Sequence, residues 1–207
     1  MNRINLIHEE EQQILHDLNV EAELGKIYYT LLALFIIDHA LTNPEEAARV
    51  EQMKQHPLLQ SIDGIRTYMG KILFYYCHKY IMRFTNDFVG MYENSKQLLA
   101  TMEQYPQHYY NVTANYMDAL SAALSAAHNV GRYDDFEDLL KKLKNLPHDK
   151  FKDEASIALK ALQYRILSYM NTQKLDLCDE LIEEYNHVKT KYAKLISDGS
   201  LLLDTYN

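Results

Sequence analysis

The chain has 207 residues and a formal net charge of −8, because 29 acidic residues outweigh 21 lysines and arginines. An acidic chain repels phosphate backbones, so the charge argues against a nucleic-acid-binding protein. The scarcity of glycine (6) and proline (4) argues against a β protein with many tight turns, and a 47% hydrophobic content is enough for one continuous core. Lys141, Lys142 and Lys144 form the densest basic cluster, which we interpret as a solvated helix face.

The N-terminal third of the sequence predicts three helices. Apolar residues at helical spacing place the first at about 4–18 and a second, longer one at about 21–41. Asn43 then provides an N-cap, and Pro44 occupies the first position of a third helix that ends near residue 56.

Longer and shorter helices alternate along the rest of the chain. We expect helices at about 58–84, 86–104, 109–129, 133–146, 151–170 and 174–191, and the start of another at 194–206. Short turns between consecutive helices force hairpins, and each hairpin must bury its apolar face against the next. The sequence therefore predicts one domain over residues 1–207, with hairpins at about 21–56, 58–104, 109–146 and 151–191.

The clearest internal repeat ends with the segment 131–147. This segment opens with a turn glycine, Gly131, carries an aromatic residue two positions later, Tyr133, and closes at Pro147. Apolar residues recur about 41 residues away on both sides. On the N-terminal side, Leu98, Leu99 and Met102 match Leu139, Leu140 and Leu143. The positions that we expect to be buried are Leu139, Leu140, Leu143, Leu181 and Ile182.

This repeat resembles the second half of a tetratricopeptide repeat, although its spacing exceeds the usual length of about 34 residues. The resemblance implies an all-α fold, a right-handed superhelical stack of antiparallel helix hairpins. HEAT-like units and an irregular helical bundle stay open as alternatives, because other stacked α-hairpins produce much of the same pattern.

No motif in the sequence indicates catalysis, a metal or a cofactor. Glu184 and His187 form an isolated E-x-x-H, whereas a di-iron bundle needs two such pairs. Cys77 and His78 are adjacent, and adjacent helical side chains diverge, so we interpret Cys77 as a buried filler and His78 as a satisfied core or groove histidine. We therefore predict a protein that is not an enzyme and that holds no cofactor and no metal.

The sequence also argues against secretion and membrane insertion. The apolar run at the N-terminus is too short for a signal peptide, and the most apolar stretch, 27–37, is too short to span a bilayer. Cys77 and Cys178 form no metal or redox spacing. A cytoplasmic location is the resulting expectation.

The resemblance implies that the first helix of each hairpin lines a concave surface. With Gly131 as the turn, the polar residues of helix 109–129 separate cleanly from the apolar ones and fall on the groove side. The predicted binding residues are Asp118, Ser121, Ser125, His128, Asn129, Lys160 and Gln163. Too few of them are basic or amide side chains for the carboxylate clamp that binds acidic peptide termini in this family.

We expect a non-catalytic interaction module that binds a protein or peptide in this concave face. No nucleic acid or membrane is expected as a partner, and the oligomeric state stays open. The alternative is a ligand-sensing regulatory domain that binds a small molecule or signalling peptide in a pocket lined by some of the 17 tyrosines. An unfamiliar enzyme is a third possibility, which would need convergent titratable groups in a pocket.

Overall fold

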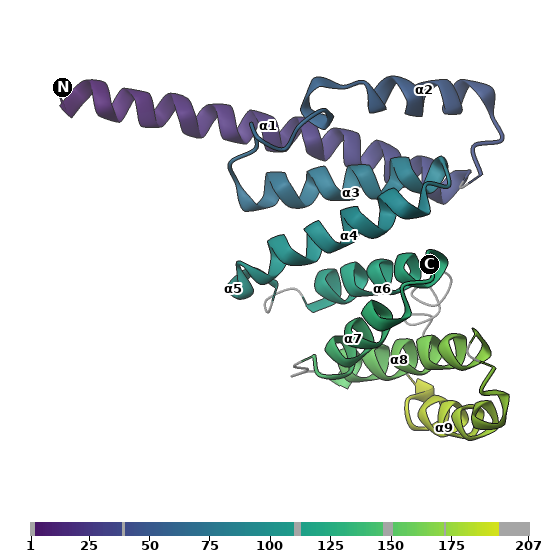
Figure 1. The fold of residues 1–207 in the computed structure, drawn as a ribbon. Coiled ribbons are helices and arrows are strands. Elements are labelled where there is room, and N and C mark those ends of the chain that lie inside the picture. The colour runs from purple at the N-terminus through teal and green to yellow at the C-terminus, as the bar shows by residue number, and fades with distance from the viewer. Residues whose placement is uncertain (1–2, 39, 110–112, 147–150, 172, 195–207) are drawn as a thin grey trace. The chain divides into compact units, whose positions relative to one another are not determined.

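A computed structural model describes residues 3–38, 40–109, 113–146, 151–171 and 173–194. Within these ranges all regular elements are helices, as predicted (Figure 1). They fall into two compact units, which we call unit 1 (Met1–Gln104) and unit 2 (Tyr105–Asn207). No helix in the described ranges combines the length and the apolar character needed to cross a lipid bilayer.

Unit 1 begins with α1 (Arg3–Ile37), a single helix of 35 residues. The prediction of two helices, at 4–18 and 21–41, is wrong because residues 19 and 20 contain no glycine or proline that would break the helix. The helix ends just before Asp38, whose carboxylate accepts hydrogen bonds from the Thr42 hydroxyl at 2.9 Å and the Asn43 amide at 3.1 Å. Figure 1 shows the first half of α1 extending beyond the other helices of unit 1.

Side-chain caps start the next helices of unit 1. Asn43 caps α2 (Pro44–Lys54) as predicted, by accepting a hydrogen bond from the Glu45 amide. After a short 3-10 turn, η1 (Pro57–Leu59), α3 (Tyr68–Phe84) begins ten residues later than predicted. Its N-cap is Thr67, whose hydroxyl accepts from the Gly70 amide. Asp87 caps α4 (Phe88–Glu103) near its predicted position.

The core of unit 1 lies between α1 and α3. One face of α1 buries apolar residues spaced three or four apart, which are Val20, Leu24, Ile27, Leu31 and Leu34. They pack with Cys77, Tyr80 and Ile81 of α3, and α3 packs in turn against α4. Within the predicted hairpin at 21–56, α1 makes only a small contact with α2, and its main contact is with α3.

Unit 2 has a more regular order of contacts. Its helices are α5 (Pro106–Tyr109), α6 (Thr113–Asn129), α7 (Tyr133–Lys144), α8 (Phe151–Asn171), the 3-10 turn η3 (Leu175–Leu177) and α9 (Cys178–Lys191). α6 packs against α7, α8 packs against α9, and both α6 and α7 contact α8. The predicted stop at Pro147 lies outside the described residues, as does the predicted helix at 194–206 beyond Lys194.

The predicted core positions are buried with one exception. Leu139, Leu140, Leu143 and Leu181 are all buried, as predicted, and so are the matching residues of α4, Leu98, Leu99 and Met102. Ile182 is 49% exposed, so its prediction is wrong. α9 packs against α8 through Tyr185 and Val188, which share a helix face with Leu181, and Ile182 lies about 100° away from that face.

Candidate functional site

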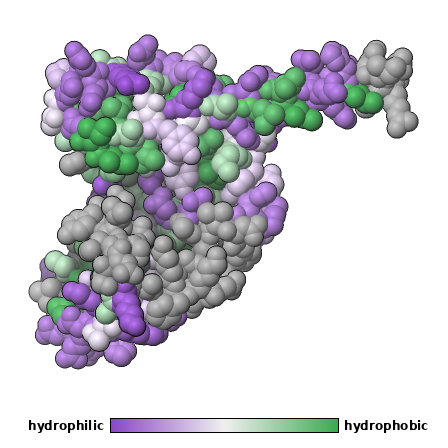
Figure 2. Space-filling view, turned by 180° about the vertical axis from the view of Figure 1, so that it is seen from behind, coloured by the Kyte–Doolittle hydropathy of each residue, from purple (hydrophilic) through white to green (hydrophobic). Residues whose placement is uncertain are grey.

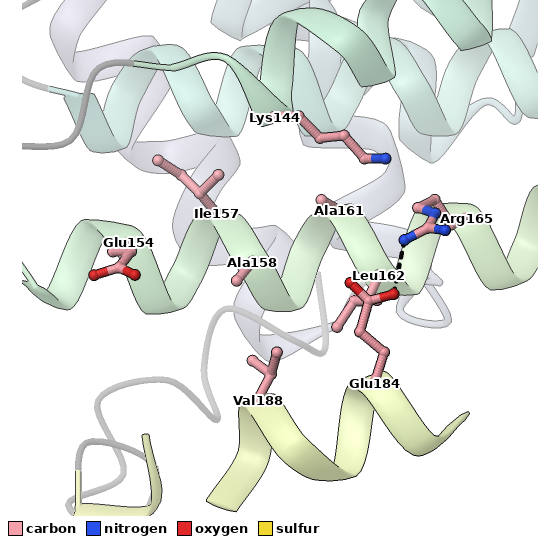
Figure 3. Close-up of a pocket in the computed structure, with 9 residues that line it drawn as sticks. All are labelled: Lys144, Glu154, Ile157, Ala158, Ala161, Leu162, Arg165, Glu184 and Val188. Atoms are coloured by element: carbon pink, nitrogen blue, oxygen red, sulfur yellow. Dashed lines mark hydrogen bonds and ion pairs between the residues drawn. The ribbon is translucent and has the colours of Figure 1, made fainter. Parts of the chain in front are cut away.

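Unit 2 contains an open pocket with a volume of about 360 Å³, on the surface of α8 between α7 and α9 (Figure 3). Its lining comprises Lys144 from α7, then Glu154, Ile157, Ala158, Ala161, Leu162 and Arg165 from α8, and Glu184 and Val188 from α9. Ala158 and Ala161 of α8 have small side chains and lie between Lys144 of α7 and Val188 of α9. The floor is therefore apolar, and the charged groups stand around it.

Two cations lie at one end of the pocket. The Arg165 Nη1 atom donates to Glu184 Oε2 at 2.8 Å and so ties α8 to α9. Figure 3 shows the Lys144 ammonium group reaching from α7 over α8 toward Arg165. Among the described residues, no hydrogen-bond or ion-pair partner lies within reach of this ammonium group. A guest anion would therefore meet its strongest attraction at Lys144.

The surroundings of Lys144 disfavour its charged form. Partial burial, and then repulsion from Arg165, lower the pKa of Lys144 below its usual value, while attraction by Glu184 and Glu137 opposes the shift. An anion bound beside the ammonium group would relieve this repulsion. The arrangement is thus suited to a carboxylate that carries an apolar neighbour.

At the opposite end of the pocket, a lysine offsets the charge of Glu154. The Glu154 Oε1 atom accepts hydrogen bonds from the Tyr192 hydroxyl at 2.7 Å and from Lys191 Nζ at 3.0 Å. Because Lys191 offsets the Glu154 charge, this end does not repel a guest anion strongly. The same two bonds anchor the end of α9 to α8.

The structure does not gather the predicted binding residues around this pocket. None of the seven lines it, and their exposure varies: Asn129 and Gln163 are exposed, Asp118, Ser125 and His128 are half-buried, and Ser121 and Lys160 are buried. The buried pair offers little surface to a ligand. A groove on this face would rest mainly on the exposed and half-buried members.

Ser121 and Ser125, two of the predicted binding residues, take part in hydrogen bonds around Tyr164. The Tyr164 hydroxyl of α8 donates to the Ser121 carbonyl of α6 at 2.7 Å and lies 2.9 Å from the Ser125 hydroxyl. The Ser121 hydroxyl donates to the Met117 carbonyl at 2.9 Å. These serines therefore help to join α6 to α8.

The pocket residues were hard to find by sequence reasoning. Lys144 belongs to the basic cluster that we interpreted as solvated, and Glu184 to an E-x-x-H pair whose metal chemistry we rejected. Arg165 and Glu184 are 19 positions apart, and their pairing follows only from the register of α8 on α9. A search for opposite charges on facing helices of one hairpin is the signal that could have found them.

The adjacent Cys77 and His78 of unit 1 point to different places. Cys77 is fully buried, which raises its thiol pKa to about 12 and confirms it as a core filler. His78 Nε2 lies 3.0 Å from the Leu59 carbonyl, to which it donates. Burial lowers the pKa of His78, and the bond to Leu59 partly offsets this effect. Among the described residues, no three histidine, cysteine or acidic side chains are grouped closely enough to hold a metal ion.

No family model, curated protein or solved structure matches the chain. Function must therefore be inferred from the geometry of the two units.

Proposed function

We propose that this chain is a cytoplasmic, non-catalytic interaction module, a right-handed superhelical stack of helix hairpins that binds a peptide segment of a partner protein. The pocket on α8 anchors an acidic residue of that segment together with an apolar neighbour. The observation that carries the proposal is the Lys144 ammonium group, which stands over an apolar hollow without a partner among the described residues.

The size and shape of the pocket favour a peptide side chain. A volume of about 360 Å³ lies near the lower end of the range for ligand pockets, roughly 300–1,000 Å³. This space accommodates one or two side chains, and its open mouth allows the rest of a peptide to continue along the surface. The carboxylate of the guest would contact Lys144, and its apolar neighbour would cover Ala158 and Ala161.

A tyrosine-lined small-molecule site receives less support. The described lining of this pocket contains no tyrosine. In unit 1, the rings of Tyr28, Tyr76 and Tyr80 pack on one another with centroids 5.7 and 6.1 Å from the Tyr28 ring. Tyrosine rings that pack on one another in this way contribute to the core of unit 1.

Peptide binding with matched charge changes tests the proposal. Short fluorescein-labelled peptides would carry either a Glu-Leu or a Gln-Leu pair, and fluorescence anisotropy would give their dissociation constants. We expect tighter binding of the Glu-Leu peptides, a preference that Lys144→Glu reduces by about tenfold. Lys189→Glu makes the same charge change at an exposed α9 position outside the pocket and should keep the preference. Equal affinities of both peptide types for the unmodified protein would contradict the proposal.

The pH dependence of binding gives an independent check. Only the protonated form of Lys144 attracts a carboxylate, and its pKa is lowered. Affinity for the Glu-Leu peptides should therefore fall as pH rises, starting at a lower pH than for an ordinary lysine. Gln-Leu peptides should lack this dependence.

The predicted groove between the first helices needs its own variant. Asn129→Ala combined with Gln163→Ala alters exposed members of the predicted set without touching buried ones. If this double variant weakens peptide binding and Lys144→Glu does not, the binding surface is the predicted groove and the pocket is not the anchor.

A further inference from the structure

The first half of α1 has no packing partner within the described residues. We call residues 3–19 the N-terminal arm. None of the arm side chains described, from Ile7 to Asn19, is buried, and the first buried residue of α1 is Val20. Hydrophobic residues nevertheless interrupt the hydrophilic surface of the arm (Figure 2). An isolated helix of this length is only marginally stable in water, so a partner would be needed to hold it.

A second apolar face runs along α1, from the arm into the part that packs on α3. We call this face the outer stripe. Its members lie at the three-four spacing of a heptad repeat and are Leu15, Leu18, Ala22, Gly25, Tyr29 and Ile36. Leu32 occupies the position between the last two and packs partly against the core of unit 1. They are offset by two positions, or about 200° around the helix, from the residues buried against α3. Leu15 is 55% exposed, Leu18 is 56% exposed and Tyr29 is 67% exposed, so the stripe faces solvent.

We propose that the outer stripes of two copies of this chain pair as an antiparallel coiled coil, with the two-fold axis beside residue 20. In this register, large side chains of the arm meet small residues on the partner's helix. Leu15 meets Gly25 of the partner subunit, and Leu18 meets Ala22 of the partner subunit. Each arm thereby covers the exposed face of the other copy's α1. This pairing is independent of the peptide site on α8.

The proposed register explains why residue 25 is a glycine, whereas packing within one chain does not. It lies inside a helix, where glycine is unfavourable compared with alanine. A Cβ atom added at Gly25 would meet nothing within 4 Å, so packing inside unit 1 does not require a glycine there. The close approach of a leucine from a second copy would require it.

The distribution of charge selects the antiparallel orientation. Glu9, Glu10 and Glu11 cluster near the start of the arm, and Lys26 is the sole lysine or arginine between residues 4 and 37. A parallel pair would set the glutamate clusters against each other, which is destabilising. The antiparallel pair sets each cluster beside the neutral residues 29–31 instead, which begin three positions after Lys26. The Lys26 ammonium group also pairs with Glu23 of its own helix at 2.9 Å.

The exposed area is also sufficient for a stable dimer. Six apolar side chains on or beside the outer stripe are at least half exposed, and each would bury roughly 100 Å² of apolar surface. Four lie on the stripe, Leu15, Leu18, Tyr29 and Ile36, and two lie beside it, Ile7 and Ile14. Their sum and the flanking polar atoms approach the area of about 800 Å² per partner that is usual for specific interfaces. The arm extends clear of α2 and α3, which leaves room for a second helix beside it (Figure 1).

Sedimentation equilibrium of the full chain tests this inference. We expect a dimer at micromolar concentrations and a monomer for the double variant Leu15→Glu with Leu18→Glu. Val89→Glu changes an exposed apolar residue of α4 instead and should leave the dimer intact. A monomeric unmodified protein at about 100 µM would overturn the inference, as would a dimer that survives the double variant.

Gly25 supplies a test that loss of folding cannot mimic. Gly25→Leu improves helix propensity and meets open space in the single chain, so the melting temperature of the monomer should not fall. The added side chain would occupy the place of Leu15 of the partner subunit and weaken dimerisation at least tenfold. Undiminished dimerisation of Gly25→Leu would contradict the register. Gly25→Ala should keep the dimer.

Discussion

Unit 1 and unit 2 bury their helices in different ways. In unit 2, α6 contributes Ala119, Ala123, Ala126 and Ala127, all fully buried, to a face that lets α7 and α8 approach closely. In unit 1, α1 and α3 meet through large rings such as Phe35 and Tyr80, whose centroids are 5.4 Å apart. Small side chains therefore let the helices of unit 2 pack closely, whereas rings fill the space between α1 and α3 in unit 1.

Leucine truncation in each core should have the largest effect. Leu31→Ala removes a fully buried side chain from unit 1, and Leu140→Ala removes a buried one from unit 2. Each should cost about 2–5 kcal/mol of unfolding free energy, because lost burial and the remaining cavity both destabilise the unit. Denaturant unfolding gives the cost. Hydrogen exchange shows whether protection is lost only in the altered unit.

The same two variants test whether the two units have separate cores. Loss of protection throughout the chain for both variants would show that the two cores unfold as one. A cost below about 0.5 kcal/mol for Leu140→Ala would show that the repeat does not define the core of unit 2.

Removal of the Tyr164 hydroxyl should have a smaller effect, confined to unit 2. Tyr164→Phe keeps the ring but removes the hydrogen bonds to the Ser121 carbonyl and the Ser125 hydroxyl. The expected loss is about 1 kcal/mol of unfolding free energy, measured by urea denaturation. Tyr133→Phe, at an exposed ring, is the matched control. Equal effects of the two variants would mean that the bond between α6 and α8 contributes nothing to stability.

The helix starts that the sequence predicted well are those marked by a clear capping residue. Asn43 with Pro44 marked the start of α2, and Asp87 lay within the cap predicted for α4, because side chains that accept from the first free amides are readable in sequence. The start of α3 was misplaced because apolar residues keep a three-four spacing across the turn η1 and the cap Thr67, at Leu58, Ile62, Ile65 and Met69. Local spacing alone does not tell such a stretch from a helix.

The pocket was less predictable than the helices. Its lining comes from three helices, α7, α8 and α9, with the small Ala158 and Ala161 between them, so it depends on tertiary packing. The predicted groove residues were chosen by their angular position around the helix. That position separated the apolar from the polar residues of α6 well. It could not show that Tyr164 reaches across from α8 to bond Ser121 and Ser125.

Acid should destabilise unit 1 through His78. Burial lowers the pKa of His78, so the unfolded chain binds a proton more readily than the folded one. This contribution to stability is complete above the unfolded pKa of about 6.5 and is lost as pH falls through the lower folded value. His78→Gln retains a donor for the Leu59 carbonyl and should flatten the decline in melting temperature between neutral and mildly acidic pH. His16→Gln, at an exposed arm position, should leave the decline unchanged.

The smallest loss of stability should come from truncating Ile182, an exposed residue that follows the buried Leu181. Leu181 is 2% exposed, whereas Ile182, the next residue of α9, is 49% exposed. Leu181→Ala should therefore cost about 2–5 kcal/mol of unfolding free energy and Ile182→Ala less than about 0.5 kcal/mol, as measured by urea denaturation. The repeat pattern gives both residues the same status, so the difference between them isolates the register of α9 on α8. Comparable costs for the two variants would mean that α9 is rotated about its axis, which would also separate Glu184 from Arg165 and remove the wall of the pocket.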